Sequence, residues 1–523
     1  MREILIVSGN VPKKDASASA NPHWISFRNQ GAHRIATALR EMGRDAEVVD
    51  NAQWFGPQDV EALLSTRIGP GSLLLAFSVG FWFARMDLAM HWARAARALA
   101  PGIKIAVCGP KIGSAMEFLP GADLVVAGYA EAALPDLLAH LEGRDGLKAR
   151  RLPSGALAVS CQADYPQPKL PPLITRMQER DFVERGETLF LEASRGCVFR
   201  CAFCDFHLIG KRKGDYIRPR DAILEQMQEH ARWGVRSFIL CDETSNELDA
   251  KLEDLAWASE RMPERPALSG FVRADLMAAR PAQLDLMERA GLLRWHLGLE
   301  TFNEASAKAI GKGAMAGRKV ALALEGARRR FGDELTVGAS LIVGLPCDTA
   351  ADLREMRAWL SDSEVVSHAT FFRLWLFDTA KDGLGLLADD GLSLMARDPA
   401  KYGYERWEGG IPAPYVDRVH ASEFLWRSKA GMGIFEAADL ADELNVETNG
   451  RGRTWRGASM WRRAAAAGLG FDSLRDHGGT VDLLAIERMH QMRARRYVRS
   501  KIRWSDLSGR GAREPADLAS VPA

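Results

Sequence analysis

The chain has 523 residues, with 69 Lys and Arg against 68 Asp and Glu, and 47% of its residues are apolar. This is the composition of a folded chain of two to four domains, and it excludes global disorder. The longest apolar run stops at Arg85 after 13 residues, too short for a membrane span, and the first residues lack the pattern of a secretory signal. We therefore expect a cytoplasmic protein without a membrane segment. Its seven cysteines, three of them within eight residues, then indicate metal binding or catalysis rather than disulfides.

Strand-like and helix-like segments alternate through residues 1–150. The expected strands are Ile4 to Val7, Ala46 to Val49, Leu73 to Ser78, Ile103 to Cys108 and Leu124 to Ala127, with helices between them. Continuous apolar strands separated by amphipathic helices predict a parallel sheet that is covered on both faces. Residues 1–150 are therefore predicted to form a Rossmann-like (flavodoxin-like) domain.

A proline-rich stretch at 165–172 cannot be a helix or a central strand, and it predicts a linker over residues 151–183. The alternation of strand and helix then resumes. Six strand–helix units in about 200 residues predict a partial (β/α)6 barrel over residues 184–385, whose chemistry lies at the carboxyl ends of its strands. Residues 386–523 have weaker periodicity and are predicted to be a mainly helical accessory region.

Three cysteines follow the first barrel strand with the spacing C-x3-C-x2-C: Cys197, Cys201 and Cys204. Three thiolates in one loop hold three corners of a 4Fe-4S cube and leave the fourth iron open. Zinc is the competing interpretation, but structural zinc takes four Cys or His ligands, and only His207 lies nearby. Buried structural cysteines are the remaining alternative, although these rarely gather three to a loop. We therefore favour the cluster.

With Phe203 directly before the last cysteine, this loop resembles the signature of the radical S-adenosylmethionine (SAM) superfamily. The resemblance implies that the three cysteines hold a 4Fe-4S cluster and that SAM binds its open iron. It also implies a one-electron reductant of the flavodoxin or ferredoxin type, and a 5′-deoxyadenosyl radical that abstracts hydrogen from the substrate. The resemblance runs from Thr188 to about Phe377.

The same resemblance places SAM contacts on several strand ends. It implies that Phe203 lies beside the adenine and that Asp242 or Glu243 binds the SAM amino group. Further contacts are implied for Glu300 and for Gly344 and Pro346 of a G-L-P-C-D-T turn, where the family usually has G-L-P-G-E-T. Core packing for Phe203 and a solvated role for the acidic pair remain open alternatives.

A Rossmann-like domain ahead of such a barrel is similar to the cobalamin-binding class of the superfamily. The resemblance implies that Ser78, Gly109 and Gly128, at the ends of the third to fifth strands, line a corrinoid site. The chain lacks a D-x-H-x-x-G motif after its first strand, so no histidine ligand for cobalt is predicted. The alternative is a domain that has the fold but binds no corrinoid.

The end of the chain is basic. Residues 448–523 carry fifteen positive and seven negative side chains, a balance of +8, so the preceding residues carry −7 of the total +1. Arginines interleaved with Trp and Tyr suit a nucleic-acid surface, because guanidinium groups neutralise phosphates and aromatic rings stack on bases. The alternative is a segment that docks on the acidic remainder of its own chain.

These features predict a radical SAM enzyme, an isomerase or a methyltransferase. The substrate ranked first is a nucleic-acid base or an amino-acid adduct on a base, as in DNA hypermodification. The alternative is a cobalamin-dependent C-methyltransferase acting on a small metabolite or peptide, and a non-catalytic iron-sulfur or corrinoid-binding module ranks third. The sequence singles out no catalytic acid or base and no oligomeric state.

Overall fold

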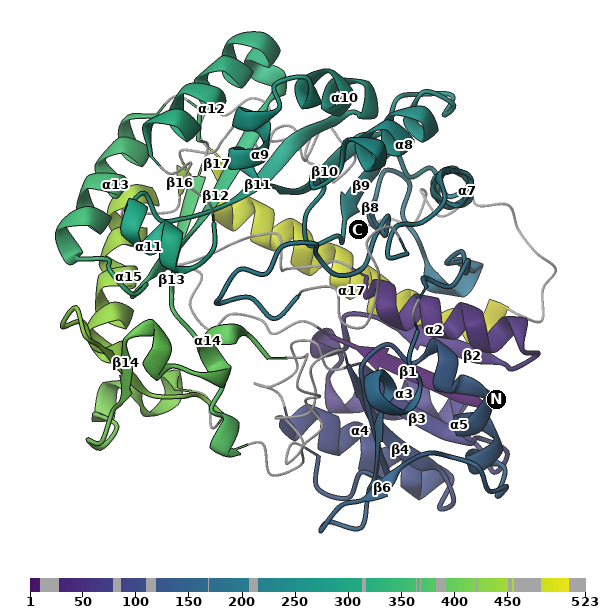
Figure 1. Ribbon diagram of the computed structural model, residues 1–523. Helices are drawn as coiled ribbons and strands as arrows, with labels where there is room; N and C mark the ends of the chain where they lie inside the picture. The colour runs from purple at the N-terminus through teal and green to yellow at the C-terminus, as the bar shows by residue number, and fades with distance from the viewer. Residues whose placement is uncertain are drawn as a thin grey trace.

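The computed structural model has two sheets that lie side by side, each built mainly of parallel strands, and a long C-terminal helix lies against the front domain (Figure 1). It describes residues 1–9, 28–78, 86–109, 119–167, 169–206, 215–312, 317–363, 365–366, 368–381, 392–419, 422–449, 454–455 and 481–507. Within those ranges, no helix combines the length and the apolar character needed to cross a bilayer.

The front domain is a seven-stranded sheet, and six of its strands run parallel. The strand order is β2 (Ala46–Val49), β1 (Ile4–Ser8), β3 (Leu74–Ser78), β4 (Lys104–Gly109), β5 (Leu124–Ala127), β7 (Leu157–Ser160) and the antiparallel β6 (Arg150–Arg151). The order β2-β1-β3-β4-β5 is that of a flavodoxin-like fold, which confirms the predicted class. The pairing of β7 with β5 carries the sheet past the expected boundary at residue 150, because Leu157–Ser160 is a short apolar run inside the expected linker.

Helices cover both faces of this sheet. Alternate residues of β1 enter two separate cores: Ile4 and Ile6 pack with α2 (Gln30–Glu41) and α5 (Leu134–Leu141), whereas Leu5 and Val7 pack with α3 (Pro57–Arg67) and α4 (Met86–Leu99). This is the period-two pattern of a strand buried on both sides.

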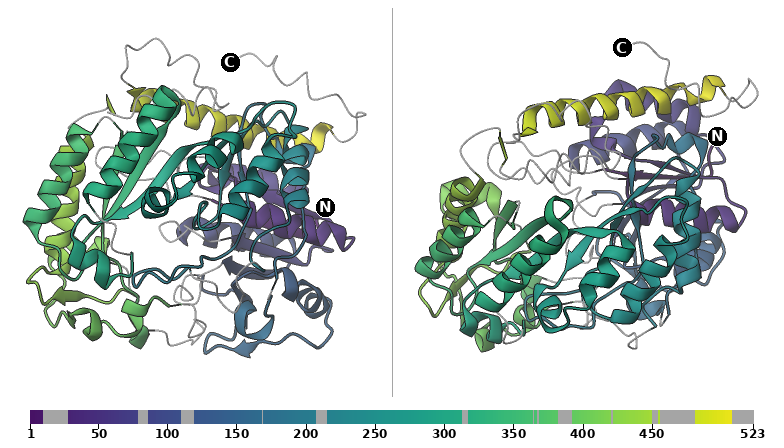
Figure 2. Two further views of the ribbon diagram at one scale, coloured as in Figure 1. Left: turned by 45° about the horizontal axis from the view of Figure 1, so that its top comes forward. Right: turned by 90° about the horizontal axis from the view of Figure 1, so that it is seen from above.

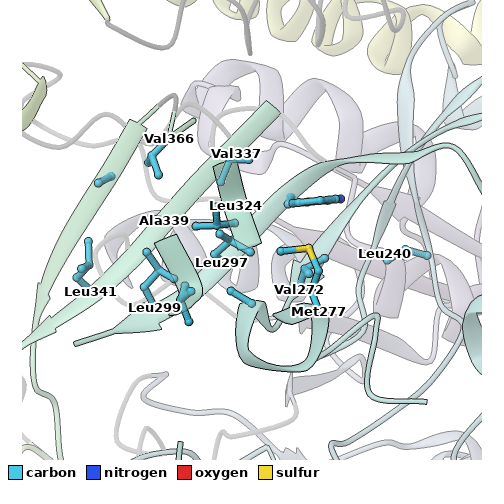
Figure 3. Packing of buried hydrophobic residues seen from close by; sticks show 14 of the residues in the cluster. Leu240, Val272, Met277, Leu297, Leu299, Leu324, Val337, Ala339, Leu341 and Val366 are labelled. Carbon is cyan, nitrogen blue, oxygen red and sulfur yellow. The ribbon is translucent and has the colours of Figure 1, made fainter. Parts of the chain in front are cut away.

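The second sheet is an open, fully parallel barrel fragment. Its strands run in the order β8 (Thr188–Leu191), β9 (Ser237–Leu240), β10 (Ala267–Val272), β11 (Leu292–Glu300), β12 (Thr336–Val343) and β13 (His368–Arg373). The connecting helices are α7 (Arg220–Ala231), α8 (Asp249–Ser259), α9 (Ala274–Ala279), α10 (Gln283–Ala290), α11 (Glu304–Ala309), α12 (Arg318–Phe331) and α13 (Ala350–Asp362). Apolar side chains from the helix-facing side of the sheet, such as Leu297 and Leu341, form its core (Figure 3). The predicted partial barrel is confirmed.

Elements after the barrel cover its open edge at β13. The side-chain amide of Asn445, on α15 (Ile434–Asn449), donates to the Phe371 carbonyl at 2.9 Å and accepts from the Phe371 N–H at 2.8 Å. The amide therefore takes the place of a neighbouring strand at that residue. Trp426, on the hairpin of β14 (Tyr404–Arg406) and β15 (Trp426–Ser428), is fully buried beside the Gly344 turn and donates to the Leu374 carbonyl at 3.1 Å.

The last helix, α17 (Leu483–Leu507), packs on the front domain, mainly against α3 (Figure 2). Tyr497 and Val498 join the core of α3 and α4, and the Tyr497 hydroxyl accepts the backbone N–H of Asp50 at 2.9 Å. Lys501 is fully buried and donates to Glu47 at 2.9 Å. Arg493 pairs with Glu184 at 2.9 Å. These contacts bear out the intramolecular alternative for this part of the basic segment, whereas residues 456–480 lie outside the described ranges.

We expect Lys501→Ala to lower the free energy of unfolding by about 3 kcal/mol, because the buried Glu47 carboxylate loses one of its cations. Arg2 and Arg67 still pair with Glu47, which keeps the loss at the lower end of the range for broken buried pairs. Urea unfolding followed by tryptophan fluorescence measures the change. Arg503→Ala, on the exposed face of the same helix, is the control and is expected to change stability by less than about 0.5 kcal/mol. Equal effects of the two variants would contradict the assignment.

Candidate functional site

The cysteine loop leaves the carboxyl end of β8 and turns at Gly196. Gly196 has a φ of +82°, a conformation that favours glycine, and its N–H donates to the Glu243 carboxylate at 2.9 Å. Cys197 and Cys201 are buried and Cys204 is half-buried. Backbone N–H groups approach the sulfur atoms, from Phe199 to Cys197 at 3.5 Å and from Phe206 to Cys204 at 3.4 Å.

Two barrel strands supply further polar groups to these sulfur atoms. The Arg273 guanidinium, after β10, donates to the Cys201 Sγ at 3.4 Å, and the Thr244 hydroxyl, after β9, lies 3.4 Å from the Cys197 Sγ. Asp275 pairs with Arg273 at 2.6 Å and orients it. Hydrogen-bond donors around thiolates stabilise their negative charge and tune an iron-sulfur cluster. These residues therefore fit a cluster held by three thiolates.

The positions of the possible metal ligands also bear on the zinc alternative. In the part of the chain that the structure describes, no three His, Cys, Asp or Glu side chains converge on one point as single-ion ligands. The thiolates of a cube bind separate irons and need no such convergence. His207, the nearby candidate ligand for zinc, lies outside the described ranges.

Asp242 is fully buried and is bonded to the strand end itself. One carboxylate oxygen accepts the backbone N–H groups of Ala193 and Ser194 at 2.9 and 3.0 Å, and the other pairs with Lys251 at 2.7 Å. Lys251, on α8, is also fully buried and donates to the Ser194 hydroxyl at 2.7 Å and to Glu247 at 3.0 Å. Burial disfavours the charged form of Lys251, but Asp242 and Glu247 outweigh burial and keep its pKa above the usual value. Asp242 therefore positions the start of the cysteine loop.

Glu243 is the neighbouring carboxylate, and it differs from Asp242 in its environment. Burial raises the pKa of Glu243 to about 7, although the Gly196 N–H favours its charged form. A carboxylate that is costly to charge gains most from a cation placed beside it. Of the two acidic residues predicted at this strand end, Glu243 is the one suited to the SAM amino group, and its role stays a prediction.

The remaining predicted SAM residues lie at the same end of the barrel. Glu300, at the end of β11, has a φ of +59° and lies 3.3 Å from the Lys312 Nζ. Gly344 has a φ of +100°, and an added Cβ there would meet the Trp426 ring at 2.3 Å, so this turn cannot take a larger residue. Pro346 is half-buried two residues further on, and Phe203 packs against the barrel core, as the packing alternative expects.

Asp348 is a further candidate that the sequence analysis noted only as a departure from the family pattern. One of its carboxylate oxygens accepts the Thr301 hydroxyl at 2.9 Å. The other is buried without a hydrogen-bond partner among the described residues. Burial raises the pKa of Asp348 to about 6. An orphaned acceptor beside the Gly344 turn fits a ligand that brings a donor.

The three predicted corrinoid residues come together at one edge of the front sheet. Ser78 pairs in register with Cys108, directly before Gly109, and Gly109 pairs with Ala127, directly before Gly128. Gly128 has a φ of +105°, and a Cβ there would lie 3.1 Å from the Cys161 side chain. Beside it, the buried Glu131 keeps one oxygen without a hydrogen-bond partner among the described residues. An acceptor of that kind fits the carboxamide side chains that a corrinoid carries.

A network of buried charges joins this edge to the cysteine loop. Arg195, two residues before Cys197, pairs with Glu131 of the front domain, and its guanidinium lies 4.2 Å from the centre of the Tyr129 ring. Arg195 also donates to Glu192 at 2.6 Å. Glu192 is further paired with Arg34 of the front domain at 2.7 Å and with Arg218. The predicted corrinoid edge and the predicted cluster therefore face each other.

Sequence reasoning missed four of these residues: Arg195, Arg273, Lys251 and Glu131. Arg195 lies two residues before Cys197 and Arg273 directly follows β10, so their positions at strand ends were the available signal. Lys251 carries no motif, although Glu247 lies only four residues before it, and Glu131 meets Arg195 across 64 positions.

We expect Lys251→Met to lower the free energy of unfolding by about 3–5 kcal/mol, because Asp242 is left buried without its cation. Loosening of Asp242 should also release the start of the cysteine loop, so iron bound per chain after anaerobic reconstitution should fall. Glu253→Ala, an exposed change on the same helix, is the control. Full iron loading together with unchanged stability in Lys251→Met would contradict this role.

Comparison with known proteins agrees with this geometry. Residues 191–360 match the family model of the radical SAM superfamily. Over 201 residues, 36% of the chain, it is 27% identical to the ribosomal protein uS12 methylthiotransferase RimO of Salinispora tropica, of which the match covers 38%. The chain thus spans less than two thirds of the length of these curated relatives.

Two solved structures have a similar fold over more of the chain. The radical SAM methyltransferase TsrM from Kitasatospora setae, with cobalamin and a [4Fe-4S] cluster bound, is similar over 97% of this chain and 100% of its own, with a TM-score of 0.60 and 15% identity. The cobalamin-dependent SAM radical enzyme OxsB covers 75% of this chain and 57% of its own, with a TM-score of 0.50 and 17% identity. A radical SAM domain implies a 4Fe-4S cluster and SAM as cofactors. The chain contains a radical SAM domain over residues 191–360, within a two-sheet fold similar to that of cobalamin-dependent members of the superfamily.

Proposed function

We propose that the chain is a radical SAM methyltransferase that carries cobalamin in its front domain. The observation that carries the proposal is the ion pair between the buried Arg195, from the cysteine loop, and Glu131 at the edge of the front sheet, where Arg195 also lies over the Tyr129 ring. A methyl group that passes from SAM to a corrinoid requires the two groups to face each other. A domain that had lost its corrinoid would not need to hold this edge of its sheet opposite the cysteine loop.

The chain's own residues then have separate tasks. Cys197, Cys201 and Cys204 hold the cluster, Glu243 binds the SAM amino group, and Ser78, Gly109 and Gly128 line the corrinoid. When bound, the cluster supplies an electron and an open iron for SAM, and cobalamin supplies a carrier for the methyl group. Arg195 and Glu131 hold the two sites at a fixed spacing, and the Arg195 guanidinium lies over the ring of the exposed Tyr129.

The described part of the basic segment does not add to the nucleic-acid hypothesis. Tyr497 and Lys501 are buried against the front domain. A base or a base adduct as substrate stays a prediction that rests on residues outside the described ranges. The alternative with a small metabolite or a peptide agrees better with the described contacts, and we propose that substrate class.

Replacement of a cluster cysteine should abolish the central chemistry. Anaerobically reconstituted protein is expected to bind about four irons per chain and to turn over SAM, and Cys201→Ala is expected to lose both activities. Cys241→Ala is the matched control, because Cys241 is a free cysteine at a neighbouring strand end and contributes no predicted ligand. Iron and sulfide analysis with mass spectrometry of SAM products measures both properties. SAM turnover by the Cys201→Ala variant would contradict the proposal.

Corrinoid binding is tested at Gly128. Gly128→Val crowds Cys161 at the sheet edge, so corrinoid retained after gel filtration should fall about tenfold or more, while iron loading is unchanged. Gly155→Val, in the β6–β7 turn, is the control for strain, because Gly155 also has a positive φ but faces open space. With deuterated-methyl SAM, bound corrinoid in the parent protein should gain the labelled methyl group. Absence of any bound corrinoid in the parent protein would overturn the proposal.

A further inference from the structure

A cavity of about 340 Å³ lies where the accessory region meets the edge of the barrel. Its walls are the end of β13, the 3-10 helix Ala413–Arg418 and α15. It has the size of a small-molecule site. Phe372 of β13 pairs in register with Ile342, two residues before the Gly344 turn, so this wall of the cavity lies near the carboxyl end of the barrel. This is the end that carries the cysteine loop.

The charged groups in the cavity wall already have partners. Arg373 donates to the buried Glu423 at 3.1 Å. Arg418 donates to Asp442 at 2.6 Å. The Asn445 amide is bonded on both sides to the Phe371 backbone. An occupant with a charge of its own would have to break one of these pairs, so the wall favours an uncharged group.

Aromatic rings make up much of the surface that remains. Phe372 is 45% exposed, although it lies on a strand, and Trp375 three residues later is 44% exposed. Tyr415 and Phe435 also line the cavity, and their rings pack against each other with centres 4.7 Å apart. Among the described residues, the exposed aromatic side chains all lie at strand ends or in the cysteine loop: Tyr129, Phe206, Phe271, Phe372 and Trp375. Of these five, Phe372 lines the cavity, and a cavity lined by aromatic rings is typical of a small-molecule site.

We propose that this cavity binds an uncharged aromatic ring of the substrate and holds it at the carboxyl end of β13. The inference rests on the proposed function and names its substrate class. Phe372, Tyr415 and Phe435 supply ring contacts, which prefer offset or edge-on packing against a flat partner. Ala438 and Ala441 of α15 leave the space that the ring fills. Phe372 is the specificity residue, because it joins the cavity to the inner face of the barrel.

The test uses three neutral or charged probes of one ring size on the reconstituted full chain: 1-naphthol, 1-naphthoate and decahydro-1-naphthol. Isothermal titration calorimetry should give the tightest binding for 1-naphthol, with the anion and the non-planar alcohol each at least about tenfold weaker. If 1-naphthoate bound as tightly as 1-naphthol, the proposed preference of the cavity for an uncharged group would be wrong. Equal binding of the decahydro compound would overturn the aromatic preference.

Cavity-filling and cavity-opening variants locate the site. Ala438→Phe should weaken 1-naphthol binding about tenfold or more, whereas Glu436→Ala, exposed on the same helix, should leave it unchanged. Should Ala438→Phe fail to fold, Phe372→Ala and Phe435→Ala are expected to weaken binding by a similar factor. Unchanged binding in the folded variants overturns the proposal. The variants should keep full iron and corrinoid loading, so a failure of the proposed function shows in those loadings while ring binding is read separately.

Discussion

The structure depends on one buried carboxylate, Glu192, at the end of the first barrel strand. Three arginines surround it: Arg34 from the front domain, Arg195 from the cysteine loop and Arg218 after that loop. Removing these charges from water is costly, and the cost is repaid only when all of them meet in one geometry. The network therefore sets the angle between the two sheets at the point where the loop begins. The cysteine loop takes its shape from the domain interface as much as from its own residues.

A second buried ion pair holds the other side of the cysteine loop. Asp242 receives the two N–H groups that begin the loop, and Lys251 neutralises it from α8. Glu243, one residue further on, lacks an ion-pair partner of this strength and stays costly to charge. Two adjacent acids thus have different environments, because one has a buried cation and the other accepts the Gly196 N–H of the cysteine loop. A cationic ligand beside Glu243 would complete the arrangement.

Much of the fold follows from sequence, and the limits have physical causes. The five front strands are mostly apolar runs between helices, and the barrel strands, although some carry polar residues, alternate with helices in the same way, so both sets can be predicted from the sequence. The cysteine spacing and the strand-end glycines are local patterns, so the sequence alone suggests them as site residues, and their roles stay predictions. β7 was missed because four residues beside a proline-rich stretch carry little periodic signal. Lys251 carries no motif, although its partners Asp242 and Glu247 lie close to it in the chain. Glu131 meets Arg195 across 64 positions, and Tyr497 and Lys501 dock on residues 447 and 454 positions away, which one sequence does not pair.

The position of α17 has a consequence for how the protein forms on the ribosome. Glu47 meets Lys501 across 454 positions of the chain, and the Asp50 N–H meets the Tyr497 hydroxyl across 447. Contacts so far apart close slowly, because loop entropy must be overcome first. During synthesis the front domain emerges before α17, so its α3 face stays uncovered until α17 has followed. The front domain is therefore complete only when α17 has docked, and a chain cut short before α17 exposes that apolar face to quality control.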